Sequence, residues 1–157
     1  LEIQGYQQLF NRTSLYYNGF YMSNPKNVNS ASNVAPDKTV TDEMVHYMSV
    51  ADQYAGRLGL NYLVSEKAGI GATLGARIEG IPAYDLMGGS DGFRRPGFIF
   101  SVEPGVSYST PKNTFFVSVP VATQRNRIKS ANDWLNNKHG DAAFADYFIS
   151  ATVTHRF

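Results

Sequence analysis

Residues 97–116 alternate between two kinds of side chain, and this pattern constrains the fold more than any other part of the chain. Even positions from Phe98 to Tyr108 are all apolar, whereas the odd positions between them are mostly small or polar. A period of two places successive side chains on opposite faces of a β-strand. Residues 109–113 are rich in turn formers, and the alternation resumes after them at Phe115. The sequence therefore predicts two long antiparallel strands with unlike faces.

The same period of two marks the other extended segments of the chain. The segment 69–80 shows it most clearly, because Ile70, Leu74 and Ile78 share one face with only alanine between them. Such segments predict about seven strands, at residues 1–10, 13–23, 50–64, 69–80, 97–108, 114–121 and 144–157. Globular strands usually have about 5–6 residues, whereas a tilted strand needs about 9–11 to cross a bilayer. The strand lengths therefore favour a transmembrane barrel.

Connections between the strands alternate between short and long. The short ones are residues 11–12, 65–68 and 109–113, and the long ones are residues 24–41, 81–96 and 126–142. A short helical turn is predicted at residues 42–48, and Asp52, on the apolar face at a loop end, is expected to be exposed. Outer-membrane barrels have short turns at one end and long loops at the other. The rhythm therefore favours an all-β, antiparallel up-and-down barrel with its long loops outside the cell.

The composition argues against several other classes of protein. The 157 residues carry a formal net charge of +1, so no overall positive field favours nucleic acid as a partner. The chain has no cysteine, which excludes disulfides and cysteine metal sites. It also lacks the run of about 18 apolar residues that a membrane-spanning helix requires. Because Leu1 already lies within a strand pattern, we expect residues 1–157 to be one portion of a barrel whose first strands are encoded upstream.

Polar side chains on the second face of the strands are the candidate functional residues. A charge facing lipid would cost about 2–4 kcal/mol at the bilayer midplane, so the charged face is expected to line a wet lumen. The lumen-lining candidates are Arg57, Asn61, Thr73, Arg77, Glu79 and Glu103. Two interpretations remain open. These residues form either a polar lining that selects solutes or a salt-bridged plug that fills a narrow barrel.

No arrangement of residues in the sequence indicates an enzyme. Residues 88–92 fit the G-x-S-x-G pattern of hydrolases, but that motif needs a helix after it, and residues 93–97 leave no room for one. The three histidines, His46, His139 and His155, lack the spacing of metal ligands. We therefore expect no catalytic site, no metal and no cofactor.

Two stretches resemble known outer-membrane proteins. The final strand alternates Tyr147, Ile149 and Val153 and ends in Phe157, which resembles the C-terminal assembly signal of Gram-negative outer-membrane β-barrels. Within residues 77–127, the segments RIEGIP, GGSDGFRRPG, SVEPG and VPVATQRNR resemble an outer-membrane transporter-like family labelled as a component of a phenol-degradation pathway. The resemblance implies location in the cell outer membrane, insertion by the barrel-assembly machinery and a role in transport.

The sequence as a whole predicts the C-terminal portion of an outer-membrane β-barrel that allows passive passage or binding of a small solute, including a hydrophobic one. Outer-membrane lipids are the expected partners. Five basic residues near the extracellular loop ends are either ligands of lipopolysaccharide phosphates or simply solvated charges. They are Arg94, Arg95, Arg125, Arg127 and Lys129.

Two alternative functions fit the same alternation. In a soluble, lipocalin-like barrel the apolar face would point inward around an apolar ligand, and Arg77, Glu79 and Glu103 would face water. A purely structural envelope protein would need no open lumen. The period of two does not tell which face is outside, so the sequence leaves these alternatives open.

Overall fold

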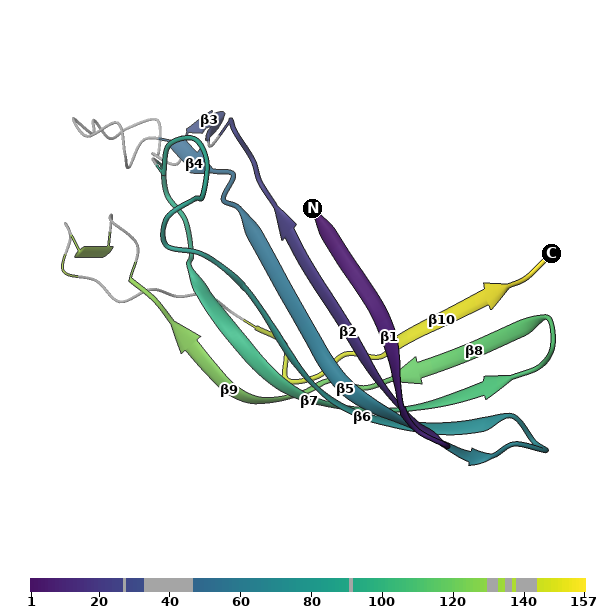
Figure 1. Cartoon of the computed structure of the whole chain (residues 1–157). Helices are drawn as coiled ribbons and strands as arrows, with labels where there is room; N and C mark the ends of the chain where they lie inside the picture. Colours follow the sequence, from purple (N-terminus) through teal and green to yellow (C-terminus); the bar gives the residue numbers. More distant parts are fainter. Residues whose placement is uncertain (27, 33–46, 91, 130–132, 135–136, 138–143) are drawn as a thin grey trace.

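The computed structural model describes residues 1–26, 28–32, 47–90, 92–129, 133–134, 137 and 144–157. The described chain is all-β, and its antiparallel main sheet curls into a half-barrel (Figure 1). The strands are β1 (Glu2–Phe10), β2 (Thr13–Met22), β3 (Val28–Ser32), β4 (Tyr47–Ser49), β5 (Gln53–Ser65), β6 (Ile70–Ile81), β7 (Gly97–Ser109), β8 (Asn113–Ser118), β9 (Val121–Arg127) and β10 (Ser150–His155). None of the described segments is a helix long and apolar enough to cross a membrane.

The main sheet follows the order of its strands along the chain. Its order is β1-β2-β5-β6-β7-β8-β10, with β9 also paired to β7. The long strands β5, β6 and β7 have 13, 12 and 13 residues, close to the predicted segments, because the two-residue alternation runs through all three. Consecutive strands pair as antiparallel neighbours, so the up-and-down topology expected from the sequence is observed across this half-barrel.

The first long connection contains regular structure that the sequence analysis did not predict. Residues 24–41 were expected to form a polar loop, yet β3 lies within them and pairs with β4 in a separate two-stranded sheet. The helical turn predicted at 42–48 is wrong for Tyr47 and Met48, which belong to β4. Residues 42–46 lie outside the described part of the chain. Backbone hydrogen bonds between β4 and Phe93 tie this small sheet to the connection that follows β6.

The strand predicted at 114–121 is interrupted, and the interruption has a covalent cause. Pro120 has no N–H group to donate to a neighbouring strand. The ladder therefore breaks between β8 and β9, and the two short strands pair with different halves of β7. The N–H of Val119 donates instead to the carbonyl of Pro104, at 2.9 Å.

The C-terminal strand is shorter than the predicted segment 144–157. Only β10 is regular strand, and it pairs with β8 from Ser150 opposite Ser118 to His155 opposite Asn113. Before it, Tyr147 forms a single bridge with Val121. The strand is short because β8, its neighbour in the described part of the sheet, itself ends where the ladder breaks before Pro120.

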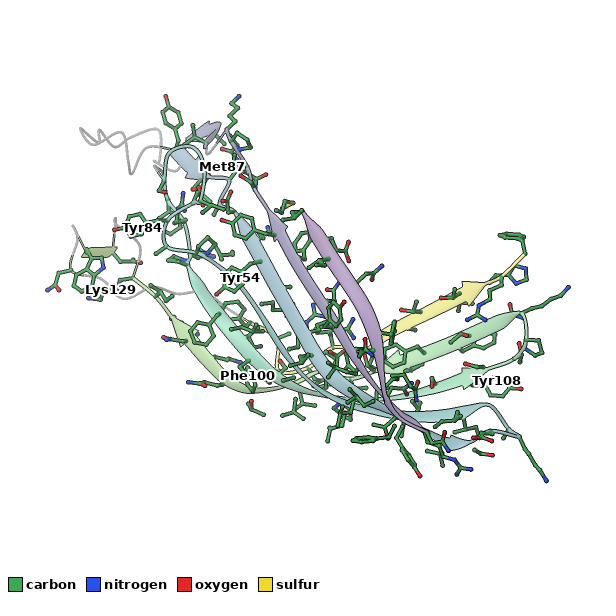
Figure 2. All side chains as sticks on the ribbon, viewed as in Figure 1. Tyr54, Tyr84, Met87, Phe100, Tyr108 and Lys129 are labelled. Atoms are coloured by element: carbon green, nitrogen blue, oxygen red, sulfur yellow. The ribbon has the colours of Figure 1, made fainter. Side chains whose placement is uncertain are left out.

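The two faces of the half-barrel carry opposite kinds of side chain. The even positions of β5, β6 and β7 form an apolar outer face, on which Leu74 and Val106 are each 60% exposed. Phe100 and Tyr108 mark this apolar row on β7 (Figure 2). The odd positions form a polar inner face that lines a hollow of about 740 Å³.

Burial in the described residues is the reverse of that in a soluble domain, where charged groups are almost never fully buried. Only two large apolar side chains, Tyr16 and Ile99, are buried there. The buried polar and charged side chains are Asp52, Arg94, Ser101, Glu103, Ser118 and Asp133. In the described residues, the buried positions are therefore filled mainly by polar and charged side chains of the inner face and the connections, and not by an apolar core.

Glycine residues on the inner face make room for one large ring. Tyr16, Gly59 and Gly75 are aligned in register across β2, β5 and β6. A Cβ atom on Gly59 would lie 2.5 Å from the Tyr16 hydroxyl oxygen, and one on Gly75 would overlap the same hydroxyl. The tyrosine therefore lies flat over both glycines and is only 8% exposed.

We predict that Gly75→Ala destabilises the fold by about 1–3 kcal/mol, the usual cost of overpacking a tight site. The new Cβ would overlap the Tyr16 hydroxyl and lie 2.9 Å from the backbone oxygen of Leu58, which cannot move aside. Urea unfolding measures the change. Gly19→Ala is the matched control, because its Cβ would meet only Ile3 at an ordinary 3.4 Å. Equal stability of the two variants would contradict the packing of Tyr16 described above.

Candidate functional site

An ion pair between Arg57 and Glu103 occupies the middle of the inner face. The Arg57 side chain on β5 donates two hydrogen bonds to the Glu103 carboxylate on β7, at 2.9 Å from Nε and 2.6 Å from Nη2. Ser118 on β8 donates a third, at 2.7 Å. The Glu103 side chain is 1% exposed, and the Arg57 side chain is 25% exposed. Three strands therefore meet at one carboxylate.

This pair crosses an intervening strand because that strand carries glycine at the crossing point. Gly59, Gly75 and Glu103 are register partners across β5, β6 and β7. No side chain on β6 stands between Arg57 and Glu103 at this level. A buried carboxylate is tolerated when it is paired and its remaining lone pairs are hydrogen-bonded. Both conditions hold for Glu103.

A second ion pair balances a repulsion within the sheet. Arg57 and Arg77 are direct register partners, and like charges in that position are unfavourable. Each arginine turns to a different acid, and Arg77 Nε donates to Glu79 at 3.0 Å. The Arg77 guanidinium also lies 4.9 Å from the ring centre of Phe148, in the segment that precedes β10. The inner face is thereby connected to the C-terminal part of the sheet.

Asn61 and Thr73 complete the set of six predicted residues. They lie on the inner face next to the Gly59–Gly75 pair, on the side away from Arg57 and Arg77. They are register partners on β5 and β6, and both line the hollow. The structure therefore places all six predicted lumen residues on the inner face. It brings them together as two ion pairs and one polar pair. Whether the face passes a solute stays a prediction.

The residues of the predicted C-terminal signal lie outside this site. Tyr147, Ile149 and Val153 are each more than 60% exposed. Val153 pairs with Phe115 on the outer face. Phe157 lies beyond β10, with its ring edge-on to His155 at 4.8 Å between the ring centres. Their role in assembly stays a prediction.

Asp52 was expected to be exposed, and this expectation is wrong. It is fully buried at the end of β5. Its carboxylate accepts hydrogen bonds from the Tyr21 hydroxyl at 2.6 Å, from the Asn24 N–H at 2.7 Å and from the Leu86 N–H at 3.0 Å. Burial acts to raise the pKa of Asp52. The three hydrogen bonds and the charge of Arg94 outweigh it, so the pKa lies below its ordinary value.

A buried ion pair lies directly beside Asp52. Arg94 donates two hydrogen bonds to Asp85, both at 2.9 Å, and the Asp52 N–H donates to the same Asp85 carboxylate. The Asp85 and Arg94 side chains are 0% and 2% exposed. We call Asp52, Asp85, Arg94, Tyr21 and Asn24 the loop node. It joins the connections that follow β2, β4 and β6.

The loop node corrects one of the predicted lipid contacts. Arg94 was a candidate ligand of lipopolysaccharide phosphates, but it is buried and its charge is taken up by Asp85. Arg125 pairs with Asp146, and Lys129 lies 4.8 Å from the ring centre of Trp134. Arg95 lies over the ring of Phe93 at 5.5 Å.

Sequence reasoning missed the loop node because its parts are far apart in the chain. The hydrogen-bond partners of Asp52 lie 28 to 34 residues away, at the end of β2 and in the connections that follow β2 and β6. The one local signal was a charged residue on the apolar face of a strand pattern. Such a residue is either exposed or paired, and the pairing partner is visible only in three dimensions.

The candidate catalytic and metal-binding residues of the sequence have other contacts or no metal-binding grouping among the described residues. No group of three histidine, cysteine, aspartate or glutamate side chains among them is placed to hold a metal ion. Ser90, from the G-x-S-x-G match, accepts a hydrogen bond from the Asp85 N–H and so serves the loop node. His155 bonds Asn113, while His46 and His139 lie outside the described residues.

Comparison with known proteins adds no further assignment. No family model, no characterised protein and no solved structure matches this chain significantly. The geometry of the two faces is therefore the observation from which a function can be proposed.

We predict that Glu103→Gln lowers the free energy of unfolding by about 3 kcal/mol, because it leaves Arg57 without its charged partner in a largely buried position. Urea unfolding measures the loss. Replacing both residues, as in Arg57→Met with Glu103→Leu, should recover part of it, because no charge then stays unpaired. The control is Glu66→Gln, in an exposed pair with Arg12 at 3.5 Å. It should cost less than about 1 kcal/mol. An equal loss of unfolding free energy in Glu103→Gln and Glu66→Gln would contradict the stabilising role of the buried Arg57–Glu103 pair.

We predict that Asp52 makes folding stability depend on pH in the acid range. Because its pKa is lower in the folded protein, the unfolded chain binds the proton first as the pH falls. Its contribution is therefore complete well above its ordinary pKa of about 3.9 and is lost as the pH falls below that value. Urea unfolding at a series of pH values should show a flatter curve for Asp52→Asn.

The control for the pH series is Asp146→Asn, whose side chain is 85% exposed. Its curve should follow that of the wild type. A curve for Asp52→Asn that is parallel to the wild type would contradict the assignment of the acid dependence to the loop node.

Proposed function

We propose that this chain forms part of the wall of an outer-membrane β-barrel that allows passive passage of small solutes. The observation that carries the proposal is the inversion of the two faces. The outer face exposes apolar side chains along whole strands, and the inner face buries ion pairs. Lipid acyl chains are the natural partner of such an outer face, and water is the natural partner of the inner one.

The dimensions of the strands support the same conclusion. β5, β6 and β7 each exceed the roughly 9–11 residues that a tilted strand needs to cross the hydrocarbon layer. The short turns after β1, β5 and β7 lie at one end of the sheet, and the small sheet of β3 and β4 and the connection between β6 and β7 lie at the other (Figure 1). This asymmetry is typical of outer-membrane barrels.

The inner face favours a solute pathway over a filled plug. The ion pair of Arg57 and Glu103 lies close against the sheet, over glycine, rather than reaching out from it. A hollow of about 740 Å³ remains beside it, lined from β1 through to β10. A purely structural wall would not need this space.

The lipocalin-like alternative requires the opposite arrangement of faces. An apolar ligand inside a soluble barrel needs apolar side chains on the concave side. Here Leu74 and Val106 are on the convex side, and Arg57, Thr73 and Glu103 are on the concave side. The curvature of the sheet therefore favours the membrane proposal.

The test compares one arginine on each face of β6, in the full chain exported in a Gram-negative host. Leu74→Arg should prevent insertion, because an arginine facing lipid costs about 2–4 kcal/mol at the midplane. Thr73→Arg should insert, because its side chain opens into the hollow. Membrane fractionation and gel mobility with and without boiling measure insertion and closure, and planar-bilayer conductance measures passage.

Two outcomes would overturn the proposal. In a soluble protein Leu74→Arg only adds a surface charge, so folding and recovery in the soluble fraction would be unchanged or improved. A wild-type protein that inserts and changes mobility on boiling but never conducts would leave a structural wall without passage.

A further inference from the structure

Basic side chains outnumber acidic ones at the end of the sheet where the short turns lie. The charged residues described at this end are Arg12, Glu66, Lys67, Lys112 and Arg156. We call these five residues the short-turn rim. They come from the turns after β1, β5 and β7 and from the residues that follow β10. The rim therefore combines four basic side chains with one acidic side chain.

Backbone hydrogen bonds connect neighbouring parts of the short-turn rim. The Arg12 carbonyl accepts a hydrogen bond from β5, and the Arg156 N–H donates one to the Lys112 carbonyl, each at 2.8 Å. Between these two contacts, the Ser109 N–H donates to the Gly69 carbonyl, also at 2.8 Å. The basic residues therefore lie along one continuous edge of the sheet, held by hydrogen-bonded strand ends.

Two lysines of the short-turn rim have no charged partner. Glu66 is already paired with Arg12, at 3.5 Å. Lys67 and Lys112 are exposed, and neither takes part in an ion pair among the described residues. Arg156 also lacks such a pair, but it lines the hollow and so belongs to the inner face. The two lysines are therefore the charges that can meet a partner outside the sheet.

Aromatic side chains on the outer face border the turns that carry these lysines. Tyr108 and Phe115 are register partners on either side of the turn with Lys112, and their exposed rings stack at 6.2 Å between centres. Tyr108 marks this end of the sheet (Figure 2). Exposed Tyr62 lies on β5 shortly before Lys67. Aromatic girdles of this kind are typical of the boundary between the acyl chains and the headgroups of a membrane.

We infer that the short-turn rim binds the headgroups of anionic phospholipids such as phosphatidylglycerol through Lys67 and Lys112; this rests on the proposed location in an outer membrane. The short turns of such a barrel face the periplasm, and the membrane leaflet on that side consists of phospholipids. Anionic lipids attract lysines close to their surface. The alkyl stem of a lysine can lie along apolar surface while its ammonium group reaches a phosphate. The lysines follow the aromatic side chains along the strands, as the phosphates follow the acyl chains.

The experiment uses the full chain, exported in a Gram-negative host and purified in a neutral detergent. Phosphatidylglycerol with a fluorescent acyl chain is titrated, and fluorescence anisotropy measures its binding. Unlabelled phosphatidylglycerol should displace it at lower concentration than phosphatidylcholine with the same acyl chains. Lys112→Gln should weaken binding about threefold to fivefold, and the double variant Lys67→Gln with Lys112→Gln about tenfold to thirtyfold. High salt should reduce the preference of the wild type.

Lys26→Gln is the matched control for Lys112→Gln. Both lysines are exposed and follow a proline, but Lys26 lies in the connection after β2, at the other end of the sheet. Its binding should equal that of the wild type. Replacing Lys67 and Lys112 by arginine keeps both charges and should keep binding. Circular dichroism verifies that each variant keeps its sheet.

The inference is overturned if phosphatidylcholine competes equally well. It is also overturned if Lys26→Gln weakens binding as much as Lys112→Gln, as an effect of net charge alone would. Membrane fractionation separates this inference from the proposed function. A chain that inserts into the outer membrane without preferring phosphatidylglycerol keeps the proposed barrel wall and loses this inference, whereas a chain recovered in the soluble fraction overturns both.

Discussion

The buried pair of Arg57 and Glu103 is the interaction on which the inner face depends. A carboxylate that is 1% exposed is stable only while its charge and lone pairs are satisfied, and Arg57 and Ser118 do this from two different strands. The pair can form only because Gly75 leaves the strand between them bare. The same bare surface accommodates the ring of Tyr16. The Arg57–Glu103 pair and the Tyr16 ring therefore both depend on the glycines of this surface. The hollow is the space beside them that no side chain fills.

The burial of charged side chains and the exposure of apolar ones both follow from the alternation of polar and apolar residues along the strands. The side chains of a strand point to opposite faces in turn, so a one-residue shift in register would exchange the faces completely. The direct pairing of Asn61 with Thr73 and of Leu60 with Leu74 keeps like faces together across β5 and β6. Curling the sheet then decides which face is concave, and that choice separates the membrane proposal from a soluble ligand-binding barrel.

The sequence was most informative where periodicity was long. It predicted β6 and β7 to within one residue at each end and β5 to within three, and it placed all six inner-face candidates on one side. It could not predict β3 and β4, which are too short to show a period. The break before Pro120 was predictable in principle, because proline cannot donate to a ladder. The partners of Asp52 were not predictable, because they come from the end of β2 and from two connections far away in the chain.

The loop node limits where this chain can change in length. Asn24 and Leu86 must both reach the Asp52 carboxylate, so each of their connections has a fixed length up to that contact. Insertions between a strand and its node residue would pull that contact away. The exposed Met87 follows directly after the Leu86 contact (Figure 2). A peptide tag or binding loop grafted after Met87 would therefore leave the hydrogen bonds of the loop node in place. The same graft before Asp85 would separate Asp85 and Leu86 from β6 and weaken the loop node.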